Sequence, residues 1–124
     1  MFKTGQRKAR KILKATIGKK EGNALWNIIR WSFTEGLPKD IQKEYPNFAW
    51  MGFCCPMTDG SNSIIINPEH HKNSDEVALT IGHELAHALQ NVVKGAGNAN
   101  HDDEIFQCFR KAFCEALEYE SESF

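Results

Sequence analysis

The first third of the chain repeats apolar residues with the period of an α-helix. One helix is predicted for about residues 4–17, ended by Gly18, and a second for about residues 21–33. Residues 36–38, Gly-Leu-Pro, break the pattern and predict a change to extended structure. The apolar positions that define the two helices are Ala9, Ile12, Leu13, Ile17, Leu25, Ile28 and Ile29.

The next part of the chain, residues 40–67, has the pattern of β-strands. A short strand is predicted for residues 41–45 and a second for residues 48–55, which are rich in aromatic and apolar side chains. Residues 56–60, Pro-Met-Thr-Asp-Gly, contain the residue types that favour turns. The clearest strand is residues 63–67, because its three consecutive isoleucines are β-branched. We expect a small antiparallel sheet.

Two further helices follow. The first, from a cap at Asn73 or Ser74 to about Val93, has apolar residues on more than one side, which is typical of a helix buried inside a domain. The adjacent histidines at 70–71 are interpreted as loop residues rather than ligands. A last helix is predicted for residues 101–119. The apolar positions of the buried helix are Val77, Leu79, Ile81, Leu85, Ala88, Leu89 and Val92.

Composition places the chain among single globular domains. It has 124 residues, of which 41% are hydrophobic, and only four prolines. Lysines replace the apolar core of a secretory signal and no apolar run reaches membrane-spanning length, so a cytoplasmic location is expected. The four cysteines form no C-x-x-C pair, which argues against a zinc ribbon or a disulfide framework.

Charge is segregated although the formal net charge is only -1. Residues 1–20 contain basic side chains and no acid, whereas the last ten residues contain glutamates and no base. A basic helix could contact DNA through its phosphates, but the same pattern is typical of a solvated helix face, and both interpretations remain open. The basic positions are Lys3, Arg7, Lys8, Arg10, Lys11, Lys14, Lys19 and Lys20.

The buried helix carries the motif H-E-x-x-H. His83 and His87 are four residues apart and therefore lie on one helix face, where both imidazoles can bind one metal ion. Glu84 borders that site and can act as the general base for a metal-bound water. This combination predicts zinc-dependent hydrolysis, although imidazole ligands also suit manganese and other divalent metals.

A catalytic zinc site needs a third protein ligand. The extended motif H-E-x-x-H-x-x-G-x-x-H does not continue here, because Gln90 and Val93 stand at its glycine and third histidine. A glutamate followed four residues later by aspartate is absent as well, since Glu104 is followed at that spacing by Cys108. His101 and Glu104 remain as candidates.

Four segments resemble one known family. His101 begins the last helix with a large apolar residue, Ile105, four positions later. Upstream stand Leu25-Trp26-Asn27, then residues 33–38, Phe-Thr-Glu-Gly-Leu-Pro, and the strand and its exit at residues 64–68, Ile-Ile-Ile-Asn-Pro. These motifs resemble the SprT-like metalloproteases, the group that includes Spartan, over about residues 24–113.

The resemblance implies a fold and an activity. We expect one α+β, zincin-like domain over residues 1–124, with N-terminal helices, a small antiparallel sheet, the metal helix and a C-terminal helix. His83, His87 and His101 would bind zinc, and Glu84 would be the general base of an endopeptidase. Proteins, including proteins bound to DNA, are the expected substrates. Asp102 departs from the family, which usually has glycine there.

Three questions stay open at this point. Residues 64–89 are also similar to the ImmA/IrrE-type proteases, in which a glutamate on the next helix, here Glu104, would be the third ligand. A non-catalytic, zinc-stabilised module that binds nucleic acid or protein is the alternative from another functional class. The residue that stabilises the oxyanion is also open among Tyr45, Arg110 and Tyr119.

Overall fold

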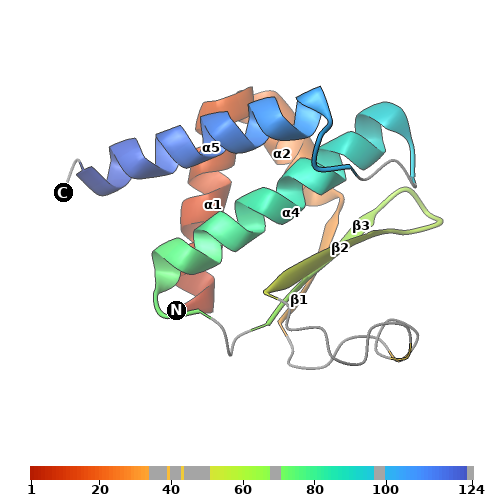
Figure 1. Cartoon of the computed structure of the whole chain (residues 1–124), viewed down its shortest axis with the longest axis horizontal. Helices are drawn as coiled ribbons and strands as arrows, with labels where there is room; N and C mark the ends of the chain where they lie inside the picture. Colours follow the sequence, from red (N-terminus) through yellow and green to blue (C-terminus); the bar gives the residue numbers. More distant parts are fainter. Residues whose placement is uncertain (34–38, 40–42, 44–50, 68–70, 97–99, 123–124) are drawn as a thin grey trace.

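The computed structural model describes residues 1–33, 39, 43, 51–67, 71–96 and 100–122, with side chains to residue 118. It confirms the α+β class (Figure 1). The elements in chain order are α1 (Phe2–Ile17), α2 (Lys19–Asn27), β1 (Ile29–Phe33), β2 (Gly52–Pro56), β3 (Asn62–Ile66), α4 (Ser74–Lys94) and α5 (Glu104–Glu122).

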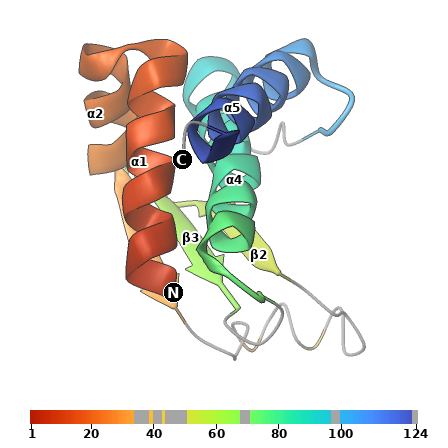
Figure 2. The same ribbon diagram turned by 90° about the vertical axis from the view of Figure 1, so that its left-hand side faces the viewer.

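Helix α4 occupies the centre of the molecule. It contacts α1, α5 and the strands β2 and β3, and Figure 1 shows it running between the sheet and α5. Figure 2 shows α1 beside α4 on the flank away from β2, with α2 on the outer side of α1. The predicted burial on several sides is therefore confirmed, and the fully buried apolar residues of α4 are Val77, Ala78, Ile81, Leu85, Ala86 and Ala88.

The sheet is mixed rather than antiparallel, which corrects the sequence-based prediction. Its order is β1-β3-β2, with β1 parallel and β2 antiparallel to the central strand β3. Ile64 and Ile66 of β3 are fully buried, as expected for the middle strand of a sheet covered by helices. Among the described strands, β2 forms the edge that faces α4 and the site described below.

The helix predicted for residues 21–33 is too long. Helix α2 ends at Asn27, and residues 29–33 form β1, which pairs with β3 from Ile29 opposite Asn62 to Phe33 opposite Ile66. The segment is rich in β-branched and aromatic side chains, which fit a pleated surface better than a helix. Pairing with β3 therefore overrides the helical spacing of its apolar residues.

The last helix, predicted for residues 101–119, instead runs from Glu104 to Glu122, and His101 lies in the turn before it. The other expected boundaries are close to those observed where the chain is described. The strand predicted at 63–67 is β3, the one predicted at 48–55 is described from residue 51 and corresponds to β2, and the strand predicted at 41–45 lies outside the described residues apart from Lys43. The Asn73 side chain caps α4 by accepting a hydrogen bond from the Glu76 N–H at 2.9 Å. None of the described helices is long and apolar enough to cross a bilayer.

Part of the N-terminal positive charge holds α1 in place. Lys8 donates hydrogen bonds to the Ser74 hydroxyl at 3.1 Å and to the Asp75 carboxylate at 2.7 Å, at the start of α4. The guanidinium of Arg10 lies 5.7 Å from the centre of the Trp26 ring, a cation–π contact. Some of the basic residues at the N-terminus therefore stabilise the fold, whether or not others bind a partner.

Helix α5 packs closely against α4 at Gly82. A Cβ atom added there would lie 2.4 Å from atoms of the buried Phe113 ring. Glycine costs helix stability relative to alanine, but here it leaves the space that the aromatic ring needs. This contact sets how near α5 comes to α4.

We expect Gly82→Ala to destabilise the protein. Overpacking costs about 1–3 kcal/mol against a gain in helix propensity of about 1 kcal/mol, so a net loss of up to about 2 kcal/mol in the free energy of unfolding should appear in urea titrations. Because Phe113→Leu removes the ring, the cost of Gly82→Ala should shrink in that background. An equal cost in both backgrounds would contradict the packing argument.

Candidate metal centre

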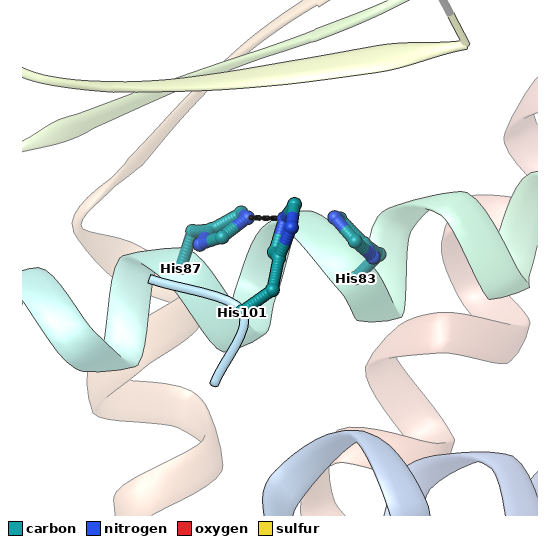
Figure 3. Close-up of side chains that lie close together, drawn as sticks. All are labelled: His83, His87 and His101. Atoms are coloured by element: carbon teal, nitrogen blue, oxygen red, sulfur yellow. Dashed lines mark hydrogen bonds between the residues drawn. The ribbon is translucent and has the colours of Figure 1, made fainter. Parts of the chain in front are cut away.

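Three histidines from two separate segments meet at one point (Figure 3). His83 and His87 lie one helical turn apart on α4, and His101 comes from the turn before α5. One ring nitrogen from each lies within 4.8 Å of those of the other two. The Nε2 atoms of His87 and His101 are 3.1 Å apart.

These positions fit a metal ion that binds imidazole. Metal–nitrogen bonds of about 2.1 Å place the nitrogen atoms of tetrahedral ligands about 3.4 Å apart. The distance of 3.1 Å between the Nε2 atoms of His87 and His101 is shorter than this value, and the limit of 4.8 Å for the three ring nitrogens is longer. A small rotation of one side chain would close the difference. Among the described residues this is the one group of histidine, cysteine or carboxylate side chains arranged to hold a metal ion.

Phe106 forms an apolar floor beneath the three imidazoles. Its ring centre lies 5.1 Å from that of His83, 4.7 Å from that of His87 and 5.0 Å from that of His101. The side chain is only 1% exposed, so it restricts the imidazoles on the side away from solvent. The family resemblance drew attention to Ile105, whereas the residue that packs against all three ligands is its neighbour.

Gln90 connects the second ligand to the loop that carries the third. Its side chain is fully buried, and its Oε1 accepts a hydrogen bond from the Nδ1–H of His87 at 2.8 Å. This bond leaves the lone pair of Nε2 free to bind a metal. The Nε2 amide of Gln90 donates to the carbonyl oxygen of Asn100 at 2.8 Å, immediately before His101.

The role of Gln90 was missed in the sequence, where the residue counted only as a departure from the extended motif. Its position three residues after His87 places both side chains on one helix face, which was the available signal. A buried amide at that spacing from a ligand histidine is suited to fix the orientation of the ring.

Further contacts hold the His101 turn against α4 and α5. Asp103 forms an ion pair with Lys94 at the end of α4 and accepts a hydrogen bond from the Phe106 N–H at 3.2 Å, which caps α5. The hydrogen bond from Lys94 is the main cause of the lowered pKa of Asp103. Gln107 donates from its side chain to the carbonyl oxygen of His101 at 3.2 Å. Asp103 is thus an acidic residue at the start of α5.

Burial favours the neutral form of both histidines on α4. Burial lowers the pKa of His83 to about 4, with smaller contributions from the charges of His87, His101 and Arg110. Burial also lowers the pKa of His87, although its hydrogen bond with Gln90 acts in the opposite direction. Neutral imidazoles keep the lone pairs that metal binding requires.

Glu84 is a buried carboxyl group between α4 and β2. It is 5% exposed, and burial raises its pKa to about 8. A Cβ atom added to Gly52 would lie 3.2 Å from the Cγ of Glu84, so the glycine lets the strand pass close to this side chain. The thiol of Cys54, two residues along the strand, also has a raised pKa, first because of burial and then because of Glu84.

A cavity of about 420 Å³ opens beside His83 and Glu84. The three histidines that could hold a metal ion, the buried carboxyl group and an accessible space therefore lie next to one another. Its lining residues are Met51, Gly52, Glu76, Leu79, Thr80, His83, Glu84 and Arg110.

The other residues that the sequence suggested as metal ligands or catalytic groups have distinct positions in the structure. Glu104 is exposed and does not belong to the ligand group found among the described residues. His71 is buried, with Nδ1 2.7 Å from the Asn67 carbonyl oxygen and Nε2 2.8 Å from the Thr80 hydroxyl, so its role is structural. Arg110 lines the cavity. Residues 45 and 70 and the side chain of residue 119 lie outside the described part.

No family model, curated protein or solved structure matched this chain. Function is therefore inferred from the residues and their arrangement. The histidine cluster, the buried carboxyl group and the adjoining cavity are the observations that bear on it.

Replacing Gln90 with alanine should weaken metal binding. Loss of a partner that orients a ligand histidine typically costs 10- to 100-fold in metal affinity, and here the loop before His101 loses an anchor as well. Competition with a chromogenic chelator measures the affinity. Gln107→Ala, which removes only the bond to the His101 carbonyl, should have a smaller effect; an equal loss in both variants would argue against a specific role for Gln90.

The buried Glu84 should make the metal-free protein less stable as pH rises. Its pKa is about 8 in the folded chain and 4.5 without burial, so the folded state binds more protons between these values and stability falls from pH 4.5 to 8. Glu84→Gln removes this penalty, which reaches about 5 kcal/mol at most. Urea titrations in chelator should show little difference from wild type at pH 4.5 and a stabilised variant at pH 9. A pH-independent difference would contradict this assignment.

Proposed function

We propose that this protein is a zinc-dependent endopeptidase. The observation that carries the proposal is the meeting of three imidazoles within 4.8 Å beside the buried carboxyl group of Glu84, at the edge of a cavity of about 420 Å³. Each part has a use in peptide hydrolysis: ligands for a metal, a base next to it, and space for a substrate.

The number of ligands favours a catalytic site over a structural one. Structural zinc sites are closed by four protein ligands, whereas catalytic sites use three and leave a position for water. The ligand group among the described residues has three members, and His101 is exposed, so solvent reaches one side of the cluster. This arrangement suits hydrolysis.

Glu84 would move the protons in the reaction. A zinc ion held by His83, His87 and His101 would supply Lewis acidity that lowers the pKa of a water molecule. Glu84 accepts a proton from this water as it attacks the carbonyl carbon, and later gives the proton to the amine that leaves. Burial raises the pKa of Glu84 in the metal-free chain, and the positive charge of a zinc ion beside it would favour the carboxylate form that accepts this proton.

Strand β2 is suited to position an extended substrate. Among the described strands it pairs only with β3, and Gly52 at its start lines the cavity next to Glu84. A peptide added along this edge would form backbone hydrogen bonds independent of sequence, as in other cases of strand addition. The scissile bond would then pass the histidine cluster.

Membership in the SprT-like family is part of the same proposal. The place of His101 in the cluster supports this family over the ImmA/IrrE type, whose glutamate ligand would be the exposed Glu104. Action on proteins bound to DNA depends on the basic residues of α1, of which Lys3 and Arg7 are exposed while Lys8 is engaged with α4. The broader proposal, that the enzyme cleaves proteins, does not depend on DNA binding.

Metal content and turnover test the proposal together. Purified wild type should contain about one zinc per chain, the stoichiometry of a single catalytic site, and His101→Ala should lose it while Glu104→Ala retains it. Glu84→Gln should keep the metal but lose about 10²- to 10⁴-fold in the rate of cleavage of a denatured fluorogenic protein, because general base catalysis is removed.

Three other outcomes would each redirect the assignment. Loss of zinc only in Glu104→Ala would favour the ImmA/IrrE type. A zinc-loaded wild type without hydrolysis, identical to Glu84→Gln, would favour the non-catalytic binding module. Failure of the wild type to bind zinc would overturn the enzyme proposal.

A further inference from the structure

Arg110 on α5 is a cation that lies between two cavities beside the histidine cluster. It lines the first cavity together with His83 and Glu84, and a second cavity of about 460 Å³ together with His101. Its side chain is exposed to solvent. No carboxylate pairs with it in the described part of the chain, where the ion pairs are Lys8–Asp75, Arg30–Asp59 and Lys94–Asp103.

The position of this charge works against the metal centre unless an anion balances it. Arg110 lines the first cavity together with His83, so its positive charge lies near the place where a metal ion would be bound and disfavours that ion. A guanidinium presents several N–H donors in a planar fork that matches a carboxylate. A substrate carboxylate in the cavity would satisfy these donors and offset the repulsion.

We propose that Arg110 binds a carboxylate of the substrate in the first cavity, so that polypeptides with an acidic group near the cleaved bond are preferred. The inference depends on the proposed protease function and names its substrate class. An aspartate or glutamate side chain and a chain-terminal carboxylate share this chemistry, and the experiment distinguishes them. Arg110 would then determine specificity by direct contact.

The remaining walls of the cavity suit an acidic side chain with an apolar stem. Met51 and Leu79 are 44% and 43% exposed and supply apolar surface next to Gly52. The other carboxylate of the lining besides Glu84 is Glu76, seven residues from His83 along α4, a rise of about 10 Å. Glu76 already accepts a hydrogen bond from the Lys72 N–H at 2.6 Å. Arg110 is the one lysine or arginine among the described residues that line this cavity, and is therefore the group suited to bind an anion there.

Substrate series on the zinc-loaded enzyme give the first test. A peptide that the enzyme cleaves is synthesised as a series. At each position near the scissile bond one peptide carries glutamate and its partner carries glutamine, and each is made with a free and with an amidated C-terminus. Wild type should prefer one carboxylate roughly 10- to 100-fold in kcat/KM, the contribution expected of a charge-assisted hydrogen bond. Arg110→Gln should abolish this preference, and Arg110→Lys should retain part of it.

The matched control is Lys111→Gln, which removes the same charge from the next residue of α5. Lys111 lines the second cavity but is not among the residues of the first. It should leave the preference unchanged. Equal loss in both variants would mean that general electrostatic attraction, rather than contact with Arg110, selects the substrate, and would overturn the proposal. Equal slowing of all peptides by Arg110→Gln would assign Arg110 to oxyanion stabilisation instead.

A binding measurement tests the inference without turnover. N-acetylglutamate N-methylamide, its glutamine analogue and N-acetylglutamine are titrated into the ¹⁵N-labelled metal-free chain, and the Nε–H signal of Arg110 is followed by NMR. The side-chain or the terminal carboxylate should shift this signal, whereas the neutral analogue should not. If no carboxylate shifts it, the inference fails even where the protease is active; if one does and no peptide is cleaved, only the protease proposal fails.

Discussion

The structure depends on the burial of α4, a helix that carries polar residues while its surroundings are apolar. Val77, Ile81 and Leu85 fix the helix in the core between α1, α5 and the sheet. Because burying a polar group without a partner costs free energy, His87 and Gln90 are joined by a hydrogen bond, and Gln90 bonds onward to the Asn100 carbonyl oxygen. At Glu84 burial raises the pKa of the carboxyl group instead. The chemistry of the site is therefore a consequence of where the helix lies.

The third histidine depends on α4 as much as the first two do. His101 belongs to a short segment that Gln90, Lys94 and Gln107 attach to the ends of the two helices, through Asn100, Asp103 and the His101 carbonyl. Phe106, buried beneath all three imidazoles, adds an apolar contact to these polar ones. A loop held at several points can present a ligand as reproducibly as a helix does, which is what a metal site with one ligand on a loop requires.

The sequence predicted the structure well where residue chemistry and hydrophobic periodicity point to the same element. It predicted much less where contacts between distant segments determine the conformation. His83 and His87 share a face because a helix has 3.6 residues per turn, and the caps and apolar pattern of α4 predicted its ends closely. The position of His101 followed only from family resemblance, because no local rule fixes the path of a loop. Residues 29–33 were assigned to a helix because their apolar spacing suits either structure, and only pairing with β3 decides for a strand. Gln90 was missed because its partners lie on another segment.

Stability and function compete at the contact of β2 with α4. Gly52 brings the strand against Glu84, and Gly82 brings α5 against the same helix from the other side. Both glycines forgo side-chain packing, and the enclosed carboxyl group costs stability at neutral and higher pH. Metal binding offsets such costs, because an ion bound only by the folded chain adds its binding free energy to folding. The folded chain thus places a destabilising buried carboxyl group next to three histidines at which metal binding would stabilise the fold.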